Sequence, residues 1–553
     1  MLSLKTHSGE AKLSEPTGRP PGRWERRDWQ ILGLLFLLAG ACFIPGLGTF
    51  GLIDPSDAYY SEGAREMLEK GDWLVPLLNY QPWFQKPILN YWLIMGSYKL
   101  FGLNELAARL PAAMCGILSV ASLYALSRRF LRRRSALLSA LVLLSSPLYL
   151  VVGHLSLTDM PFTLATTCAA LGFLALLAGA SRSVVVLSYL ALALAVLCKG
   201  PLAVVLTGMV AGLYMLATCR TGAQWLACLA KLRLLPGLIL TAASALPWYI
   251  SVSLATHGAF AREFFLNQNF GRFVGQENHH HPTVWYYLPF ALGGLAPWSV
   301  SLFLMPGRLR RVRTEIRQDT LRKMIRRYSA IWLASVFILL SLVPTKLPTY
   351  ILPIAPPLAI LVGSSLDTAI RLRKPGPLIW LAALMAVTSL GAFASAPRLL
   401  AHSPGLLAGT MLVLALLTVF YLLCSLYLSK QQMLRSVVVL TAATVFGTAL
   451  LVPTALNGYY AFHESGLRQL LQLAGRANAN LAILGPAVPS SSFYLKRPVP
   501  VLRTGQELLQ YLEDGARSHW LLVARPWLEA AQATSRSCKI IEHHRWWYLV
   551  QVD

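Results

Sequence analysis

The sequence lacks the features of a nucleotide-dependent or cysteine-based metal protein. It contains no nucleotide-binding motif, and no glycine-rich loop that could cradle phosphates follows an expected strand. Its eight cysteines show no metal-ligand spacing, and most lie in apolar runs, where cysteine behaves as a small hydrophobic residue. Charged residues are also scarce, at 13% of the chain. The informative features of the sequence are therefore its apolar runs and the few places where charged residues cluster.

Long apolar runs dominate the 553 residues, which are 55% hydrophobic with a mean hydropathy of +0.53. A helix needs about 20 apolar residues to cross about 30 Å of hydrocarbon. The runs therefore predict an all-α polytopic membrane protein with about thirteen transmembrane helices. The expected spans are 29–50, 105–127, 135–153, 160–180, 183–198, 200–218, 234–254, 284–305, 329–344, 350–366, 377–395, 405–428 and 436–455.

The net charge of +25 is concentrated in short loops between alternate spans. The largest clusters lie at 128–134, 308–327 and 371–374. Lysine and arginine are enriched in the cytoplasmic loops of membrane proteins, so this pattern predicts the topology of the chain. The confinement of the basic residues to such loops argues against nucleic acid as a partner. Residues 1–28 are expected to form a disordered cytoplasmic tail, which places every strongly basic short loop on the cytoplasmic side.

Most polar residues that are not part of the basic cytoplasmic loops are expected on the opposite, extracytoplasmic side. The transmembrane region 29–456 has its long outer loops at 51–104 and 255–283. After it, residues 457–553 alternate short apolar strands with amphipathic helices, which predicts a small α/β domain of roughly 95 residues. We assign this extracytoplasmic domain no catalysis, because it has no phosphate-binding loop.

The outer segment from Asp54 to Trp92 combines charge with aromatic residues that favour the membrane boundary. Its first carboxylates have two open interpretations. Asp54 and Asp57 can stabilise the start of a helix, with Asp54 as N-cap and Pro55 at the first helical position. Alternatively, one of them is a catalytic carboxylate that deprotonates an acceptor or orients a donor phosphate through a metal. One residue can serve both roles.

Four cations are expected on the same outer face, namely Lys86, Lys199, Arg272 and Lys346. Each alone can be an interfacial anchor whose long side chain reaches the membrane surface. Together they indicate a binding site for a lipid-linked phosphate or pyrophosphate, because ammonium and guanidinium groups are good partners for anionic headgroups.

A further carboxylate and a histidine run also fall on this face. Asp159 either N-caps the next helix, with Thr158 as the alternative cap, or serves chemistry. The histidines at 279, 280 and 281 are consecutive, so at most one or two can face one ion. We treat His279 and His281 as candidate metal ligands, against the alternative of an interfacial cluster that binds no metal.

Six stretches, taken together and in this order, resemble a known family. They read DPSDAYYSEGAREMLEKGDWLVP…FQKPILNYW, LTDMPF, CKGPLA, ALPWYI, FFLNQNFGRF…HHHPTVWYYL and TKLPTYILPIAPPLAIL. This set resembles the bacterial aminoarabinose transferases of lipid A modification, which belong to the protein O-mannosyltransferase-like integral membrane glycosyltransferases. The resemblance implies a GT-C fold, a sugar donor carried on polyprenyl phosphate and a cavity that faces the periplasm.

Two positions depart from the family's pattern. The family has an adjacent Asp-Glu pair after the first span, whereas Ser56 and Asp57 stand at the matching positions here. The family also reads Glu-Lys-Pro-Pro, where the glutamate and a later loop histidine hold a divalent metal. Gln85 replaces that glutamate, and a neutral amide is a poorer ligand for a divalent cation. We therefore expect either no cofactor or a weakly required divalent metal.

The sequence and the resemblance together predict an inner-membrane glycosyltransferase, monomeric and without a nucleic-acid partner. Its donor is a polyprenyl-phosphate sugar, and its acceptor is a lipid such as lipid A, a glycan or a protein. Lys86, Lys199, Arg272 and Lys346 are expected around the donor phosphate. A transporter or flippase of lipid-linked saccharides is the alternative, but the spans carry few charges. The catalytic candidates are Asp57, Asp54 and Asp159, and the candidates for the substrate cavity are Tyr59, Tyr60, Trp83 and Tyr350.

Overall fold

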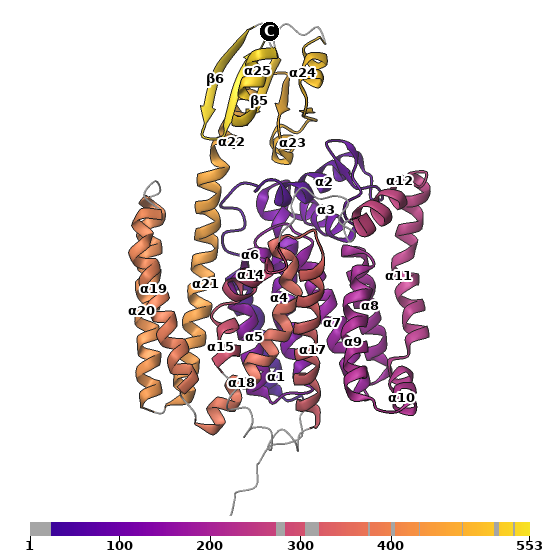
Figure 1. The fold of residues 1–553 in the computed structure, drawn as a ribbon, viewed down its shortest axis with the longest axis vertical. Helices are drawn as coiled ribbons and strands as arrows, with labels where there is room; N and C mark the ends of the chain where they lie inside the picture. The colour runs from indigo at the N-terminus through magenta and orange to yellow at the C-terminus, as the bar shows by residue number, and fades with distance from the viewer. Residues whose placement is uncertain are drawn as a thin grey trace, which may run out of the picture.

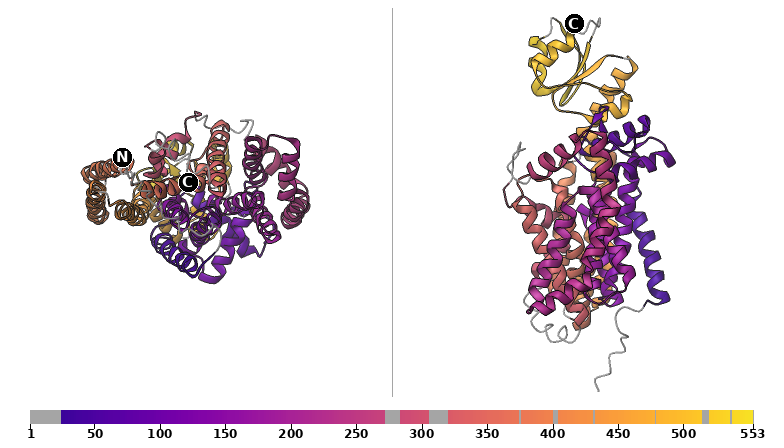
Figure 2. Two further views of the ribbon diagram at one scale, coloured as in Figure 1. Left: turned by 90° about the horizontal axis from the view of Figure 1, so that it is seen from below. Right: turned by 90° about the vertical axis from the view of Figure 1, so that its right-hand side faces the viewer.

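The computed structural model describes residues 24–271, 283–304, 320–373, 376–399, 404–430, 432–477, 479–513, 519–534 and 537–552. Helices stand side by side in a bundle, and a small domain of strands and helices sits on one end of it (Figure 1). Short helices lie across the bundle end nearest this domain (Figures 1 and 2). The prediction of a mostly helical membrane protein with a small C-terminal α/β domain is confirmed.

The helical region begins at α1 and ends with the long helix α21. Its elements are α1 (Arg26–Phe43), α2 (Ser56–Lys70), β1 (Leu77–Leu78), β2 (Gln81–Pro82), α3 (Leu89–Phe101), α4 (Glu105–Ser127), α5 (Arg133–Leu144), α6 (Pro147–Gly153), α7 (Asp159–Leu177), α8 (Arg182–Lys199), α9 (Leu202–Thr218), α10 (Gly222–Leu232), α11 (Leu234–Ala255), α12 (Ala259–Ala261), the π-helix η1 (Arg262–Gly271), α14 (Tyr287–Gly294), α15 (Trp298–Leu304), α17 (Thr320–Leu342), the 3-10 helix η3 (Pro348–Ile354), α18 (Ala355–Leu372), α19 (Gly376–Leu399), α20 (Pro404–Ser429) and α21 (Met433–His463).

Each predicted span falls on a helix or a helix pair. Among the described residues, eight helices are long and apolar enough to cross a membrane, or nine if the bent pair α5–α6 is counted as one span. The other predicted spans fall on α1, α9, α14–α15 and α19, which are shorter or carry charge. The total of about thirteen therefore stays a prediction, whereas the multi-pass architecture is confirmed.

Three expected spans differ from the structure in shape. Residues 135–153 form two helices bent by 62°, because the second begins at Pro147, which cannot donate the next helical hydrogen bond. The expected span 284–305 is likewise divided, into α14 and α15, with Pro297 between them. Helix α21 continues to His463, past the predicted end at 455, and carries the chain into the C-terminal domain (Figure 1).

Small residues allow the central helices to approach closely. Helix α7 is the most enclosed candidate span, with 89% of its apolar window buried. A Cβ atom at Gly172 would come within 2.1 Å of the Ser188 hydroxyl oxygen on α8. Small residues at such contacts let transmembrane helices pack backbone to backbone. This packing fixes the N-terminal end of α7, where Asp159 lies, against the C-terminal end of α8.

Basic residues collect at the bundle end opposite the small domain. Asp28 on α1 accepts hydrogen bonds from Arg128 (2.9 Å) and Arg133 (3.0 Å). Arg134 pairs with Asp367 of α18 at 2.5 Å. These contacts join α1, the α4–α5 turn and α18. The positive clusters and the polar outer segments thus lie at opposite ends, as the charge pattern predicts.

The C-terminal domain is a mixed sheet between two helical layers. Its strands run in the order β4-β3-β5-β7-β6, parallel for β3 with β4 and β5, and antiparallel for β7 with β5 and β6. Apolar clusters on the two sheet faces are covered by α22 and by α24 with α25. The domain's elements are α22 (Ser465–Arg476), β3 (Leu481–Leu484), α23 (Pro489–Leu495), β4 (Val501–Leu502), α24 (Gly505–Leu512), β5 (His519–Ala524), the 3-10 helix η4 (Arg525–Trp527), α25 (Leu528–Thr534), β6 (Cys538–His544) and β7 (Trp547–Val552).

Candidate functional site

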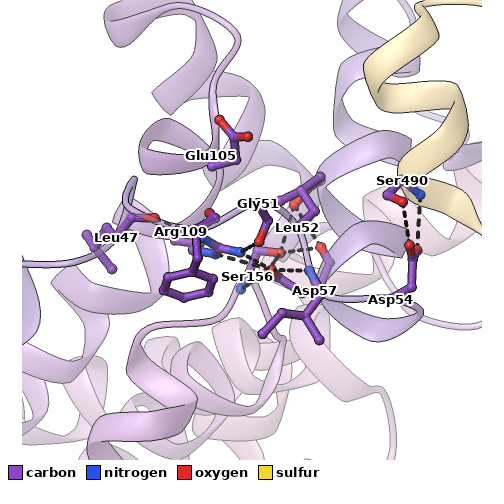
Figure 3. A network of polar contacts seen from close by, with 12 residues as sticks. Leu47, Gly51, Leu52, Asp54, Asp57, Glu105, Arg109, Ser156 and Ser490 are labelled. Carbon is purple, nitrogen blue, oxygen red and sulfur yellow. Dashed lines mark hydrogen bonds and ion pairs between the residues drawn. The ribbon is translucent and has the colours of Figure 1, made fainter. Parts of the chain in front are cut away.

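Asp57 is held in a buried network at the start of α2 (Figure 3). One carboxylate oxygen accepts hydrogen bonds from Arg109 Nη2 at 2.5 Å and from the Ile53 amide at 3.1 Å. The other accepts from the Ser156 amide at 2.8 Å and from the Ser156 hydroxyl at 2.9 Å. Asp57 is only 2% exposed. Its carboxylate is therefore occupied by the protein itself.

Arg109, on α4, lies beside Asp57 and contacts the same segment (Figure 3). Its guanidinium is fully buried and donates to the carbonyl oxygens of Leu47 (2.9 Å), Phe50 (2.8 Å) and Gly51 (2.6 Å). A buried arginine satisfied by carbonyls and one carboxylate fixes the backbone that carries those groups. Sequence reasoning missed Arg109, although an ionisable residue inside the apolar run 105–127 is itself a signal of a buried polar site.

Asp54 points instead toward the C-terminal domain (Figure 3). It accepts a hydrogen bond from the Ser490 amide at 3.0 Å and another from the Ser490 hydroxyl. Burial, opposed by these hydrogen bonds and reinforced by the nearby Asp57 charge, raises the pKa of Asp54 to about 7. Pro55 is the N-cap of α2, and no side chain caps this helix. The interpretation of Asp54 as a helix cap is therefore wrong, because its carboxylate is engaged across the domain boundary.

Asp159 and Lys199 form an ion pair at the bundle end below α2. Lys199 Nζ lies 2.7 Å from Asp159 Oδ1, and both side chains are buried. The ammonium also faces the rings of Phe162 and Tyr350, at 5.0 and 4.9 Å from their centroids. Asp159 is the first residue of α7 and Thr158 is its N-cap, without a side-chain capping bond. Asp159 is therefore the ion-pair partner of Lys199 and not the N-cap of α7.

Gly200 shapes the backbone after this lysine. It has φ +70°, and a Cβ there would lie 2.7 Å from the ring of Phe264. A side chain at this position would meet both backbone strain and a steric clash. The Lys199-Gly200-Pro201 turn thus places the lysine at the end of α8 while η1 packs closely over it.

Lys199 opens onto a cavity of about 140 Å³. Two predicted residues join it there: Lys86 from the outer segment and Tyr350 from η3. Polar groups of Gln268, Asn269 and Thr345 complete a mainly apolar wall, which also contains Phe162, Leu202, Leu206, Tyr287, Leu340 and Val343. Such a cavity, apolar with a few convergent cations, suits the phosphate end of a lipid-linked molecule.

The remaining cation candidates lie next to this cavity in the chain. Lys346 follows the lining residue Thr345, is half-buried, and has a pKa lowered by burial. Arg272 lies outside the described residues, directly after η1, whose Gln268 and Asn269 line the cavity. The predicted cluster of cations is thus brought together at Lys86 and Lys199, while the positions of Lys346 and Arg272 relative to a ligand stay predictions.

The four aromatic candidates divide between two places. Tyr350 lines the cavity that contains Lys86 and Lys199. Tyr60 lies near Tyr350: its pKa is raised by burial and by the neighbouring Tyr91, Tyr350 and Asp159. Tyr59 and Trp83 instead stack on each other in a separate cleft beside the C-terminal domain. Neighbouring residues on a helix such as Tyr59 and Tyr60 point about 100° apart, which accounts for this division. The role of the four residues in substrate binding stays a prediction.

The described residues do not supply the divalent-metal site that the family resemblance implies. In this part of the chain no three His, Cys, Asp or Glu side chains gather as metal ligands. Gln85 contributes an amide where a carboxylate is expected. The candidates His279 and His281 lie outside the described residues.

Comparison with known proteins places this geometry in context. The family model for dolichyl-phosphate-mannose-protein mannosyltransferase matches residues 85–248. The undecaprenyl phosphate-alpha-4-amino-4-deoxy-L-arabinose arabinosyl transferase of Edwardsiella ictaluri is 32% identical over 448 residues, which cover 77% of this chain and 76% of that protein. The chain belongs to this transferase family. Its members are membrane glycosyltransferases, and the predicted enzyme class is confirmed.

Two further comparisons within the family extend the match to nearly the whole chain. A transferase of the same description from Pseudomonas fluorescens is 28% identical over 533 residues, covering 92% of this chain and 91% of that one. The crystal structure of ArnT from Cupriavidus metallidurans bound to undecaprenyl phosphate superposes with a TM-score of 0.78 at 23% identity, covering 95% of this chain and 98% of that chain. The fold, including the C-terminal domain, is therefore that of an aminoarabinose transferase.

Proposed function

We propose that this protein transfers a sugar, 4-amino-4-deoxy-L-arabinose or a close relative, from undecaprenyl phosphate to lipid A. The observation that carries this proposal is the convergence of Lys86 and Lys199 on one cavity, with Asp159 holding Lys199 in place. Family membership supports the donor, because the relatives are named as arabinosyl transferases of undecaprenyl phosphate-alpha-4-amino-4-deoxy-L-arabinose. The acceptor is the one that the resemblance of the six sequence stretches implies.

Charge balance supports this cavity as the donor phosphate site. Lys86, Lys199 and Asp159 together carry one net positive charge, which matches the single negative charge of a sugar phosphodiester. Lys199 is already positioned by its 2.7 Å contact with Asp159. Because the ammonium is fixed before the donor arrives, little reorganisation is needed at the moment of reaction.

In the proposed reaction an oxygen of the acceptor attacks the anomeric carbon of the sugar. The bond between that carbon and the phosphate oxygen breaks, the electron pair stays on the phosphate, and the acceptor's proton, where it has one, is released. The leaving undecaprenyl phosphate gains a second negative charge. Lys86 and Lys199, with Lys346 and Arg272 as further candidates, stabilise this growing charge electrostatically.

The carboxylates take different parts in this proposal. Both oxygens of Asp57 are occupied by Arg109, Ile53 and Ser156, so we propose that Asp57 positions the 47–57 segment rather than contacting substrate. Asp159 is a positioning residue for Lys199. Asp54 accepts its hydrogen bonds from the amide and the hydroxyl of Ser490 rather than from a buried arginine, and its pKa is about 7, so it stays our candidate to accept a proton near neutral pH.

The charge segregation along the bundle supports a proposed orientation in the membrane. The basic clusters near Arg134 and the candidate site lie at opposite ends. Because basic loops stay in the cytoplasm, we propose a bacterial inner-membrane location with the cavity and the C-terminal domain in the periplasm. A cysteine accessibility assay in intact cells, with single cysteines placed at exposed positions of each end, measures this orientation directly.

Release of undecaprenyl phosphate tests the reaction. Purified protein in nanodiscs is incubated with undecaprenyl-phosphate aminoarabinose and lipid A, and both products are followed by mass spectrometry. We expect undecaprenyl phosphate and modified lipid A in equal amounts, and neither with the Lys86→Ala protein. Absence of release with this donor and with other polyprenyl-phosphate sugars would contradict the proposal, and donor movement across vesicles without release would indicate a flippase.

A further inference from the structure

A second cleft of about 350 Å³ lies between the membrane region and the C-terminal domain. One wall comes from α2 and the β1–β2 hairpin, and the other comes from β3, β4 and α23. The domain stands directly over α2 at this point (Figure 1). The lining of the cleft includes Tyr59, Asn79, Trp83, Val499 and Arg503.

Two aromatic rings form a platform in this cleft. The Tyr59 and Trp83 rings are stacked, with centroids 5.4 Å apart and an interplanar angle of 28°. Both side chains are only partly buried. Aromatic side chains combine a large apolar face with a polar handle, here the Tyr59 hydroxyl and the Trp83 indole N–H. Such a face suits the C–H side of a sugar ring, while the polar handles suit its hydroxyls.

A cation stands beside the aromatic platform. Arg503 is exposed and lines the cleft. The pKa of Tyr59 is raised by burial and by Asp54, and the positive charge of Arg503 acts in the opposite direction, so the guanidinium lies near the phenol. Arginine is well suited to phosphate because its planar fork matches two phosphate oxygens. The combination favours a sugar that carries a phosphate over a neutral sugar.

The walls of the cleft are held in place by polar contacts. The Tyr80 amide in the hairpin donates to Glu66 at 2.7 Å, and the Tyr80 hydroxyl donates to Glu69 at 2.8 Å. Asn79 exchanges two hydrogen bonds with the backbone of Val499, at 2.9 and 3.1 Å. The hairpin is thus tied to α2 on one side and to the domain on the other, which makes the cleft a preformed site.

The cleft is also close to the donor cavity along the chain. Trp83 and Lys86 are three residues apart, so their Cα atoms lie within about 10 Å of each other. A ligand of one or two sugar rings spans this distance. We infer that the cleft binds the phosphorylated saccharide of the acceptor, on the Tyr59–Trp83 platform and beside Arg503, while the donor occupies the Lys86–Lys199 cavity. The assignment of this sugar to the acceptor rests on the proposed function.

Binding of a soluble sugar phosphate tests the cleft without any transfer reaction. Glucosamine 1-phosphate and the neutral methyl glucosaminide are titrated onto the purified full-length protein, and contact is read by saturation-transfer NMR. We expect binding of the phosphorylated sugar to be lost in Trp83→Ala. In Arg503→Gln it should weaken by about tenfold, since one charge-assisted contact is removed. The neutral sugar should bind more weakly and be unaffected by Arg503→Gln.

Matched controls carry the same substitutions at exposed positions outside the cleft. Trp546→Ala in the β6–β7 turn and Arg525→Gln at η4 should bind both sugars as the wild type does. Because Arg503 is exposed, Arg503→Gln keeps the test decisive if Trp83→Ala gives little folded protein. The inference is overturned if the wild type binds neither sugar, if both cleft variants bind as the wild type does, or if the controls lose binding equally.

Binding of undecaprenyl phosphate to the same proteins separates this inference from the proposed function. We expect unchanged undecaprenyl phosphate binding in Trp83→Ala and Arg503→Gln, and loss in Lys86→Ala. If the wild type binds undecaprenyl phosphate but no sugar phosphate, the cleft inference fails and the donor site stands. If it binds the sugar phosphate but no undecaprenyl phosphate, the proposed donor site fails while the cleft stands.

Discussion

Replacing Asp57 by asparagine tests whether this carboxylate is structural. The change keeps the shape of the side chain but removes the charge that pairs with Arg109. Arg109 is fully buried, so the substitution leaves a guanidinium without its counter-ion in a site that excludes water. Removing one partner of a buried ion pair destabilises a protein by about 3–5 kcal/mol.

The surroundings of Arg109 place the expected loss near the lower end of this range. Three backbone carbonyls, of Leu47, Phe50 and Gly51, continue to accept hydrogen bonds from the guanidinium. We therefore expect a loss of about 3 kcal/mol of unfolding free energy. Since about 1.4 kcal/mol corresponds to tenfold, the ratio of folded to unfolded protein should fall by a little over a hundredfold.

The buried cysteines provide the assay. Cys42, Cys115, Cys198 and Cys424 are free thiols inside the helical region, so a thiol-reactive dye reports their exposure on heating. Asp57→Asn should lower the melting temperature clearly. The control Asp54→Asn changes a carboxylate that contacts Ser490 rather than a buried cation, so it should not lower the melting temperature as Asp57→Asn does.

A catalytic Asp57 gives the opposite pattern. If Asp57→Asn melts with the wild type and yet loses transfer, the carboxylate acts on substrate and our structural assignment is refuted. If Asp57→Asn is unstable but its residual folded fraction transfers at the wild-type rate per molecule, the assignment is supported.

Three further predictions concern the cavity, the domain boundary and metals. Lys86→Ala should insert normally and lose about 2–4 kcal/mol of transition-state stabilisation, or roughly 30- to 1000-fold in transfer rate, with Lys86→Arg also impaired; a rate above about a third of wild type would make Lys86 an anchor. Because the folded-state pKa of Asp54 is about 7, above its ordinary value of 3.8, the folded state binds the extra proton between these values and stability falls as pH rises through that window. The melting temperature of Asp54→Asn relative to wild type should therefore increase from about pH 4 to pH 7 and level off above; a pH-independent difference would contradict the raised pKa. Because Gln85 replaces a carboxylate, transfer should persist after chelation, and activity that vanishes with chelator and returns with zinc or magnesium would show this prediction wrong.

The sequence determined the membrane architecture to a large extent. The positions of the helices follow from apolar runs, because hydrocarbon imposes a local requirement on every spanning segment. The basic loops indicated which ends of the spans lie on the same side of the membrane, and the six motif stretches indicated the family. The proximity of Lys86 and Lys199 was also predictable, because both lie in segments that the charge pattern places on the same face of the membrane.

Tertiary structure decided which polar groups meet. Asp54 contacts Ser490 across 436 positions of sequence, and Asp57 contacts Arg109 across 52, so spacing alone could rank neither carboxylate. Tyr59 and Tyr60 are neighbours in sequence, but Tyr59 lines the cleft beside the C-terminal domain whereas Tyr60 packs against Tyr91. The physical reason is that a helix fixes the direction of each side chain, whereas the packing of α2 against α4 and the C-terminal domain determines what lies in that direction.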